Sequence, residues 1–381
     1  MQWGVYIHIP FCRQKCFYCD FPSYAGREKY MEAYTEALCQ EIAIQGLSYR
    51  QKWGKPATVY IGGGTPTALP GALLKKILQA VVESLGNDVP EFTVECNPGT
   101  VDAAYLTLLK AGGVNRLSFG VQSFKDSLLQ SIGRIHSGQE AVMAVREAQA
   151  VGFTNISVDL MYGLPQQTLA DVAESIAQAQ ALGIQHISIY GLQLEEGTVF
   201  AQQYDQGKML LPAEEAAEAM YDYLNAELPR QGFARYEVSN FAQPGRESRH
   251  NLSYWQDVPY LGLGAAAHSY LAGWRYENTS DIAAYIAKIK TGESVRQLEE
   301  EPTRQHAMEE FAFLALRTVT GLSREKFAAK FQVELDDIYG ASIQKMAAQG
   351  LLIVDAEGCR LTAKGFKYGN VVFAEFLLSD E

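Results

Sequence analysis

The sequence predicts an α/β protein: a partial, TIM-like (β/α)6 barrel followed by a small winged-helix-like domain. Over about the first 195 residues, short β-branched runs alternate with longer amphipathic segments, which is typical of parallel strands joined by crossover helices. Six strand candidates are too few for a closed eight-stranded barrel, so we expect an open one. From about residue 303 the pattern changes to three helices and a hairpin. We therefore divide the chain into a barrel domain with extension strands (1–300) and a C-terminal domain (301–381).

The individual elements follow from hydrophobic periodicity, taken in chain order. The expected barrel strands are 3–9, 58–61, 91–96, 116–120, 155–160 and 186–190, and the expected helices between them are 29–45, 70–85, 102–111, 138–151 and 169–182. A helix over 213–230, a strand over 235–240 and a glycine-rich apolar strand within 260–272 should follow. The C-terminal helices are expected over 308–317, 324–331 and 335–349, and the hairpin over 351–361.

Composition narrows the class of protein. The chain has 381 residues, 48% of them hydrophobic, which supports a full core. A net charge of −12 disfavours nucleic acid as a partner, because phosphate contacts need clustered Lys and Arg. The sequence has no signal-peptide pattern and no apolar run of membrane-spanning length. We expect a soluble, cytoplasmic protein whose scattered Cys39, Cys96 and Cys359 are buried thiols, and whose C-terminal domain is a lid or a docking surface.

Three cysteines follow the first expected strand. Cys12, Cys16 and Cys19 have the spacing C-x3-C-x2-C within a short loop. Three thiolates on a cubane [4Fe–4S] cluster leave one iron without a protein ligand, and that iron is open to chemistry. A zinc site completed by His8 is an alternative, although zinc ligand pairs usually come from separate knuckles. A disulfide would need an oxidising compartment, and buried structural thiols would not need to cluster.

Polar and glycine residues collect at the ends of the later strands, where the active site of such a barrel lies. A glycine triplet lets the backbone approach a ligand closely, or simply makes a tight strand-to-helix turn. A carboxylate in a buried strand is costly unless it pairs with an ammonium, with hydroxyls or with a structural cation. An arginine can clamp a carboxylate, or it can lie on the surface. The candidates are Gly63, Gly64, Thr65, Glu95, Gln122, Arg134 and Asp159.

The cysteine motif, followed by Asp20-Phe21, resembles that of radical S-adenosylmethionine (SAM) enzymes. Further stretches resemble the oxygen-independent coproporphyrinogen III oxidase family, and together they span most of the chain: Y-I-H-I-P-F-C, G-G-G-T-P-T, V-E-x-N-P, F-G-V-Q-S-F, D-L-M-Y-G-L-P and L-G-L-G-A-A-A-H-S. The resemblance implies that the three cysteines hold the cluster. It also implies contacts with SAM at Tyr6, Tyr18, Gly63, Gly64, Thr65, Glu95, Gln122, Arg134 and Asp159. The family oxidase can hold two SAM molecules, and these contacts are divided between them. The family position of His268 lies near SAM, and a core histidine is the alternative.

Within that family, the haem-chaperone branch (HemW type) matches best. Phe21 stands where the oxidase has a further cysteine, and the first strand begins almost at Met1, where the oxidase has an extension. The stretch from His250 to Trp255 resembles the H-N-x-x-Y-W motif of this branch, whose histidine is linked to haem binding. A neutral imidazole is a good haem ligand, whereas a histidine that ties down a loop is the alternative.

We therefore expect a haem chaperone that binds a [4Fe–4S] cluster, SAM and haem. Its expected partners are an electron donor and respiratory haem proteins, which receive the haem and can be membrane-bound. The alternative is a coproporphyrinogen III oxidase that decarboxylates two propionate chains by radical chemistry.

Overall fold

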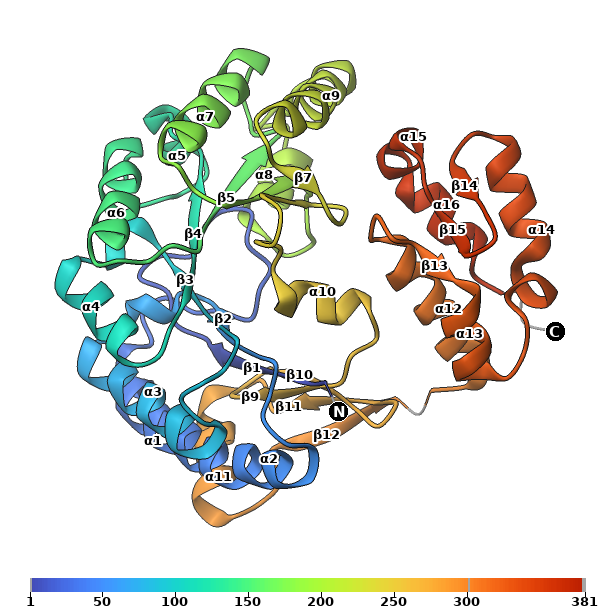
Figure 1. Cartoon of the computed structure of the whole chain (residues 1–381). Helices are drawn as coiled ribbons and strands as arrows, with labels where there is room; N and C mark the ends of the chain where they lie inside the picture. Colours follow the sequence, from blue (N-terminus) through green and yellow to red (C-terminus); the bar gives the residue numbers. More distant parts are fainter. Residues whose placement is uncertain (1, 301, 379–381) are drawn as a thin grey trace.

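The computed structural model describes residues 2–300 and 302–378, and it consists of a large barrel-shaped unit with a smaller C-terminal unit beside it (Figure 1). Residue 301, where the predicted second domain begins, lies outside the described residues. The two units have separate hydrophobic cores. The larger core extends from Trp3 to Val295 and the smaller from Met308 to Phe376.

Six parallel strands in sequential order form the wall of the barrel, as the sequence predicts. They are β1 (Gly4–Ile9), β2 (Thr58–Gly63), β3 (Glu91–Cys96), β4 (Arg116–Gln122), β5 (Ile156–Tyr162) and β6 (His186–Gly191). The register aligns Gly4 with Thr58 and Thr58 with Glu91, so these strands begin at one level. All their carboxyl ends therefore open at the opposite end of the barrel.

Helices cover the outside of this wall. They are α1 (Met31–Glu41), α2 (Leu47–Trp53), α3 (Gly71–Leu85), α4 (Ala103–Ala111), α5 (Asp126–Ser131), α6 (Gly138–Ala150) and α7 (Leu169–Ala181), with short helical turns η1 (Glu28–Tyr30), η3 (Pro66–Ala68) and η4 (Pro98–Thr100). Capping boxes begin α6 at Ser137 and α7 at Thr168. The predicted helix 29–45 is helical throughout, but it is not a single α-helix and does not end at residue 45. A π-helical segment η2 (Ile42–Gly46) joins α1 to α2, and helical structure continues to Trp53. The six-residue α5 is too short to give a periodic signal.

Further strands extend the sheet on both sides, to twelve strands in the described part of the chain. On the β6 side lie α8 (Val199–Asp205), α9 (Glu214–Arg230), β7 (Ala234–Arg235), β8 (Asn240–Ala242) and α10 (Arg249–Trp255). On the β1 side lie β9 (Tyr260–Leu263), β10 (His268–Leu271), β11 (Trp274–Asn278), α11 (Ile282–Thr291) and β12 (Arg296–Glu300).

Two predicted strands are corrected here. The strand 235–240 is instead a tight antiparallel pair, because Glu237 accepts a hydrogen bond from the Ser239 amide (3.1 Å) and the chain turns between β7 and β8. The apolar stretch 260–272 is a pair as well, since Gly264 and Ala266 adopt positive φ and reverse the chain between β9 and β10.

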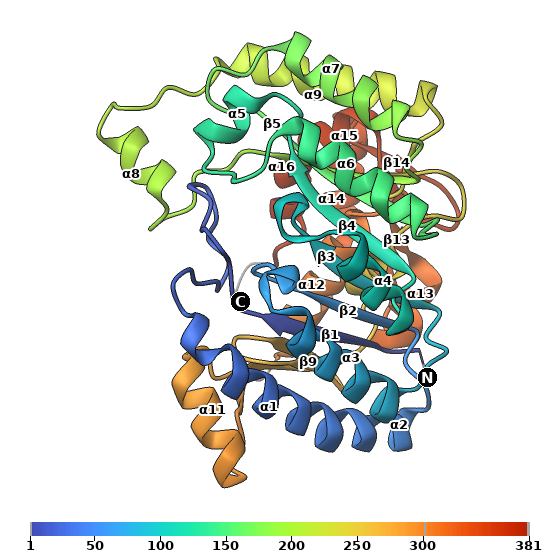
Figure 2. The same cartoon turned by 90° about the vertical axis from the view of Figure 1, so that its left-hand side faces the viewer.

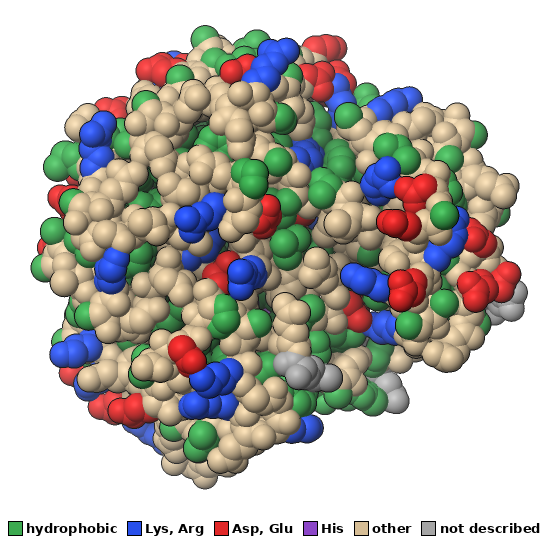
Figure 3. Space-filling model, viewed as in Figure 1, with side chains coloured by type: hydrophobic (Ala, Val, Ile, Leu, Met, Phe, Trp, Pro, Cys, Tyr) green, Lys and Arg blue, Asp and Glu red, His purple; other side chains and the backbone are tan. Residues whose placement is uncertain are grey.

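The C-terminal unit has the predicted winged-helix-like form. Its elements are α12 (Arg304–Leu316), β13 (Leu322–Ser323), α13 (Arg324–Phe331), α14 (Leu335–Ala348), β14 (Leu352–Val354), β15 (Gly358–Leu361), α15 (Ala363–Lys367) and α16 (Gly369–Glu375). The last two helices were not predicted. Charges of both signs are interspersed over the visible face of this unit (Figure 3).

The C-terminal unit lies beside β7 and α10 rather than across the carboxyl ends of the barrel strands (Figure 1). Val319 donates a backbone hydrogen bond to Tyr236 (3.1 Å), and Lys367 pairs with Asp222 and Glu218 at 2.7 Å each. No helix of the described residues is both long enough and apolar enough to cross a membrane.

Candidate functional site

The cysteine loop lies at the carboxyl end of β1 and is held there by segments distant in the sequence. Arg13 donates to the Gly99 carbonyl (2.8 Å), Gln14 donates to the Gly133 carbonyl (3.0 Å), and the Phe17 amide donates to Ile132 (3.1 Å). A small apolar cluster that includes Phe200 of α8 packs under Phe17. Figure 2 shows this loop and α8 on the same side of the barrel. The loop geometry is therefore set by the segment after β3, the turn between α5 and α6, and helix α8.

A pocket of about 400 Å³ opens beside this loop. It gathers the three cysteines and most of the polar residues predicted from the sequence: Cys12, Cys16, Cys19, Tyr18, Gly63, Gly64, Thr65, Glu95, Gln122, Arg134 and Asp159. Except for Arg134, which lies in the turn between α5 and α6, these residues lie within or just after β1 to β5, and the parallel order of the strands brings them to one mouth. We call this cavity the cofactor pocket.

Each cysteine sulfur in the cofactor pocket has a hydrogen-bonding neighbour. Thr65 Oγ1 donates to Cys12 Sγ (3.6 Å), Arg134 Nη1 donates to Cys16 Sγ (3.4 Å), and Ser23 Oγ lies 4.0 Å from Cys19 Sγ. Burial raises the pKa of the Cys12 and Cys19 thiols. A metal cluster would offset this cost, because a coordinated thiol loses its proton. The sulfurs and their donors therefore fit an anionic iron–sulfur group.

The zinc alternative lacks its fourth ligand. His8 uses one ring nitrogen on the Pro22 carbonyl (2.8 Å) and the other on the Tyr6 hydroxyl (3.0 Å). Among the described residues, no three His, Cys, Asp or Glu side chains converge in the manner of a single-ion site. The cysteines share the wall of a pocket instead, which suits a cluster whose ligands bind different irons.

The glycines after β2 make room in the pocket. Gly63 has φ +109°, and a Cβ there would lie 2.5 Å from the His8 ring, whereas a Cβ on Gly64 would lie 2.7 Å from the Phe11 carbonyl oxygen. Both positions thus exclude side chains, and their backbone forms part of the cofactor pocket.

Glu95 and Asp159 are the two acids of the pocket wall. Glu95 accepts hydrogen bonds from the Tyr60 hydroxyl (2.7 Å) and the Gly63 amide (3.2 Å), and burial raises its pKa to about 7. Ser118 donates to both carboxylate oxygens of Asp159 at 3.2 and 3.3 Å, and burial raises the pKa of this acid as well. Raised carboxyl pKa values indicate a site that would gain from a cationic ligand.

Arg116 is a buried cation that the sequence reasoning missed. It is the first residue of β4, is 1% exposed, and its Nε has no hydrogen-bond partner among the described residues. It lies on the same strand face as Ser118, below Glu95. Its positive charge partly offsets the effect of burial, which raises the pKa of Glu95 and of Asp159. Strand alternation on the predicted 116–120 segment was the available signal, because it puts Arg116 on the face of Ser118 rather than on that of Leu117 and Phe119.

Two predicted residues do not line the cofactor pocket. Tyr6 lies inside the barrel, with its hydroxyl on His8. His250 lies at the opposite end: the first amides of α10, at Arg249 and His250, both donate to the Glu91 carboxylate at 2.9 Å, and Glu91 is the first residue of β3. About 15 Å of strand separates that level from Gly63.

The His250 ring is buried, and both of its nitrogens have hydrogen-bonding partners. It is 1% exposed, stacks on Tyr60, and its nitrogens contact Thr58 Oγ1 and the Tyr254 hydroxyl, each at 2.8 Å. His268, by contrast, lies exposed at the start of β10, with Nδ1 3.3 Å from Glu299.

Comparison with known proteins agrees with this geometry. The model of the radical SAM superfamily matches residues 6–179, and that of the HemN C-terminal domain matches residues 303–367. The chain is similar to the curated heme chaperone HemW of Bacillus subtilis (strain 168), with 40% identity covering 98% of this chain and 99% of the relative. It is also similar to the HemW of Lactococcus lactis subsp. lactis (strain IL1403), with 39% identity covering 99% of this chain and 98% of the relative.

A solved structure shares the fold over nearly the full length. The coproporphyrinogen III oxidase HemN from Escherichia coli, described as a radical SAM enzyme, aligns with a TM-score of 0.84, covering 98% of this chain and 90% of that one. The two sequences are 23% identical, so the likeness establishes the architecture.

Proposed function

The chain belongs to the haem chaperone HemW family of radical SAM proteins, and on this premise we propose that it binds haem and passes it to haem proteins. The single observation that carries the proposal is the full-length similarity to curated haem chaperones. The cofactor pocket supports the radical SAM part of it, because three thiols, two acids and a glycine-rich backbone meet there.

A radical SAM protein carries a [4Fe–4S] cluster, which can reduce the sulfonium of SAM when both are bound. We assign Cys12, Cys16 and Cys19 as the ligands of the cluster. The donors Thr65 and Arg134 then stabilise the negative charge on the sulfurs. The buried Nε of Arg134 is without a partner among the described residues, which leaves a donor for a carboxylate of SAM.

The remaining pocket residues are assigned to SAM itself. The backbone of Gly63 and Gly64, with the Glu95 carboxylate, is suited to the ammonium group. Asp159 and Gln122 are suited to hydroxyl and base edges, and Tyr18 covers one wall. Tyr6 acts at a distance, by fixing the His8 ring. The prediction that His250 ligates haem iron stays a prediction, and for that role the ring must release either Thr58 or Tyr254, because each occupies one of its two nitrogens.

The wider expectations enter the proposal as well. We keep the division into domains 1–300 and 301–381, an electron donor for the cluster, respiratory haem proteins as recipients, and the cytoplasm as the location. The C-terminal unit then serves as the surface that meets the recipient, because it lies beside the barrel and not across the carboxyl ends of the barrel strands (Figure 1).

The alternative function is oxidative decarboxylation of coproporphyrinogen III, and the fold shared with the E. coli oxidase favours it. Protein reconstituted without oxygen separates the two. A haem chaperone binds haem in a titration and yields no protoporphyrinogen from coproporphyrinogen III, SAM and reductant. Product in that assay would establish the oxidase instead.

A further inference from the structure

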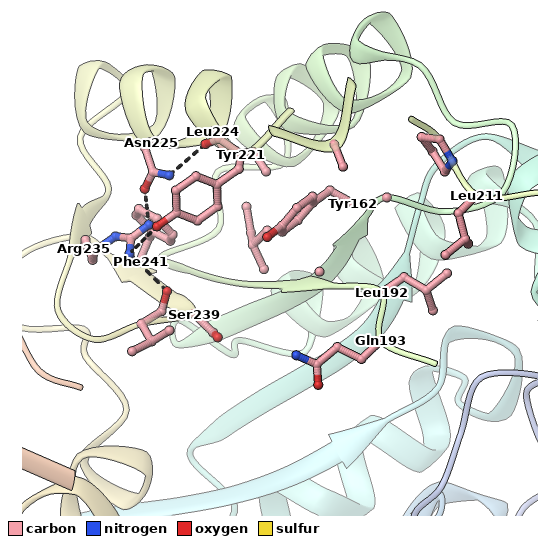
Figure 4. A pocket seen from close by; sticks show the side chains of 16 residues that line it. Tyr162, Leu192, Gln193, Leu211, Tyr221, Leu224, Asn225, Arg235, Ser239 and Phe241 are labelled. Carbon is pink, nitrogen blue, oxygen red and sulfur yellow. Dashed lines mark hydrogen bonds between the residues drawn. The ribbon is translucent and has the colours of Figure 1, made fainter. Parts of the chain in front are cut away.

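A second cavity, of about 390 Å³, lies between α9 and the ends of β5, β6 and β8 (Figure 4). The rings of Tyr162, Tyr221 and Phe241 and apolar side chains such as Leu192 and Leu224 form most of its wall. We call it the aromatic pocket. A largely apolar cavity with a few polar groups at defined positions is the usual form of a small-molecule site.

The charge in this pocket is a single arginine. Of the described residues in its wall, Arg235 alone is charged. Nη1 donates to the Tyr221 hydroxyl (3.3 Å) and to the Val238 carbonyl (3.2 Å), and Nη2 donates to the side chain of Asn225 (Figure 4). These acceptors are all neutral.

The acid nearest in sequence does not neutralise this charge. Burial raises the pKa of Glu237, and the charge of Arg235 offsets this only in part. The Glu237 carboxylate accepts from the Ser239 amide, and no ion pair joins Glu237 to Arg235 among the described residues. The guanidinium lies 4.8 Å from the ring centres of Phe241 and Phe366. A cation held between aromatic rings without a carboxylate partner favours an anionic group on the ligand.

The aromatic pocket adjoins the cofactor pocket. Gly191, Leu192 and Gln193 line both cavities, and the Tyr162 hydroxyl lies over Gly191, where a Cβ would approach it to 2.8 Å. On its other side, Arg235 and Tyr221 also line a cavity of about 640 Å³ against α15 of the C-terminal unit. A ligand here would therefore lie between the cofactor pocket and the C-terminal unit.

We propose that the aromatic pocket holds haem, with the macrocycle against Tyr162, Tyr221 and Phe241 and a propionate paired with Arg235. The proposal rests on the proposed function, which it deepens by naming the place where haem binds. Haem matches the wall because it is planar, apolar and anionic at one edge. A second SAM molecule matches less well, because its sulfonium and ammonium would face a pocket whose one charge is positive.

Haem titration of the full-length, anaerobically reconstituted protein tests this. Arg235→Gln removes the charge, and we expect haem to bind about tenfold to a hundredfold more weakly. Ala217→Phe, on the pocket face of α9, fills the cavity without touching the arginine and should also reduce haem uptake. Arg230→Gln removes an exposed charge from the end of α9 and should leave binding unchanged.

A chemical control uses haem with both propionates esterified. The ester should bind the unaltered protein more weakly than haem does, and Arg235→Gln should bind haem and ester alike. SAM stoichiometry is measured on the same samples, and a loss of one SAM per chain in Arg235→Gln with haem binding retained would assign the pocket to SAM and overturn the proposal.

The proposed function and the haem site are contradicted by different results. If the unaltered protein takes up no haem, the proposed function is wrong, and the haem site with it. If the unaltered protein binds haem and both pocket variants bind it equally well, the haem site alone is wrong. If His250→Ala abolishes binding while the pocket variants keep it, haem lies at the other end of the barrel and this assignment is likewise overturned.

Discussion

Replacing His250 by alanine should destabilise the protein and leave haem binding in place. The ring is 1% exposed and lies between Thr58, Tyr60 and Tyr254, so nothing refills its space. Its loss leaves the Thr58 and Tyr254 hydroxyls without their partner, at about 1–3 kcal/mol for each buried group. The two effects overlap, and truncation of a buried ring to alanine costs about 3–5 kcal/mol in total.

Chemical denaturation of the apoprotein measures this loss, and haem titration of the reconstituted variant measures binding. Thr58→Val is the matched control, because it removes the other end of the same hydrogen bond. The double variant should be less destabilised than the sum of the two single ones. An unaltered denaturation midpoint for His250→Ala, together with lost haem binding, would refute the reasoning.

Three further predictions concern the cofactor pocket. Because the pKa of Glu95 is raised to about 7, the carboxylate assigned to the SAM ammonium becomes protonated below pH 7, and SAM affinity should weaken there by up to about tenfold per pH unit. Calorimetry should find weak, pH-independent SAM binding for Glu95→Gln, and a variant with the same pH profile as the unaltered protein would contradict the assignment. Arg134→Gln removes a charged hydrogen-bond donor to Cys16, so the reduction potential of the cluster should fall by roughly 60 mV. A reduction potential that is unchanged or higher in a redox titration would count against that contact. Gly63→Ala should cost at least about 1–3 kcal/mol and abolish SAM binding, since its φ is +109° and its Cβ meets the His8 ring at 2.5 Å. Gly183→Ala, where φ is also positive (+65°) but the space is open, should lose a little stability and keep SAM binding.

Much of the architecture can be derived from local patterns. The six parallel strands, most of their helices and the C-terminal hairpin were predicted because each carries its own periodicity, and β3 was predicted to the residue. The cysteine loop was recognisable for the same reason, since its three cysteines lie within eight residues of one another. Short segments and chain reversals were not predicted. The residues of β7 and β8 were predicted as one strand, because the turn between them depends on the Glu237 carboxylate.

Other features depend on which end of the barrel a residue occupies, and spacing along the chain does not decide that. His250 begins a motif that suits haem binding. Its helix, however, is capped by Glu91 at the amino-terminal ends of the strands, far from the cysteines. Arg116 becomes a lumen cation only because strand register sets it below Glu95. The aromatic pocket joins Tyr162 of β5 to Tyr221 of α9 and Arg235 of β7.

The sequence by itself therefore determined the class of fold and the grouping of three cysteines in one loop, because periodicity and a compact motif are local properties of the chain. Tertiary structure alone decided which polar side chains share a cavity and which face the opposite end of the barrel. The physical reason is that parallel strands bring together the carboxyl ends of segments that lie 23 or more residues apart, so that register, not sequence distance, sets their neighbours.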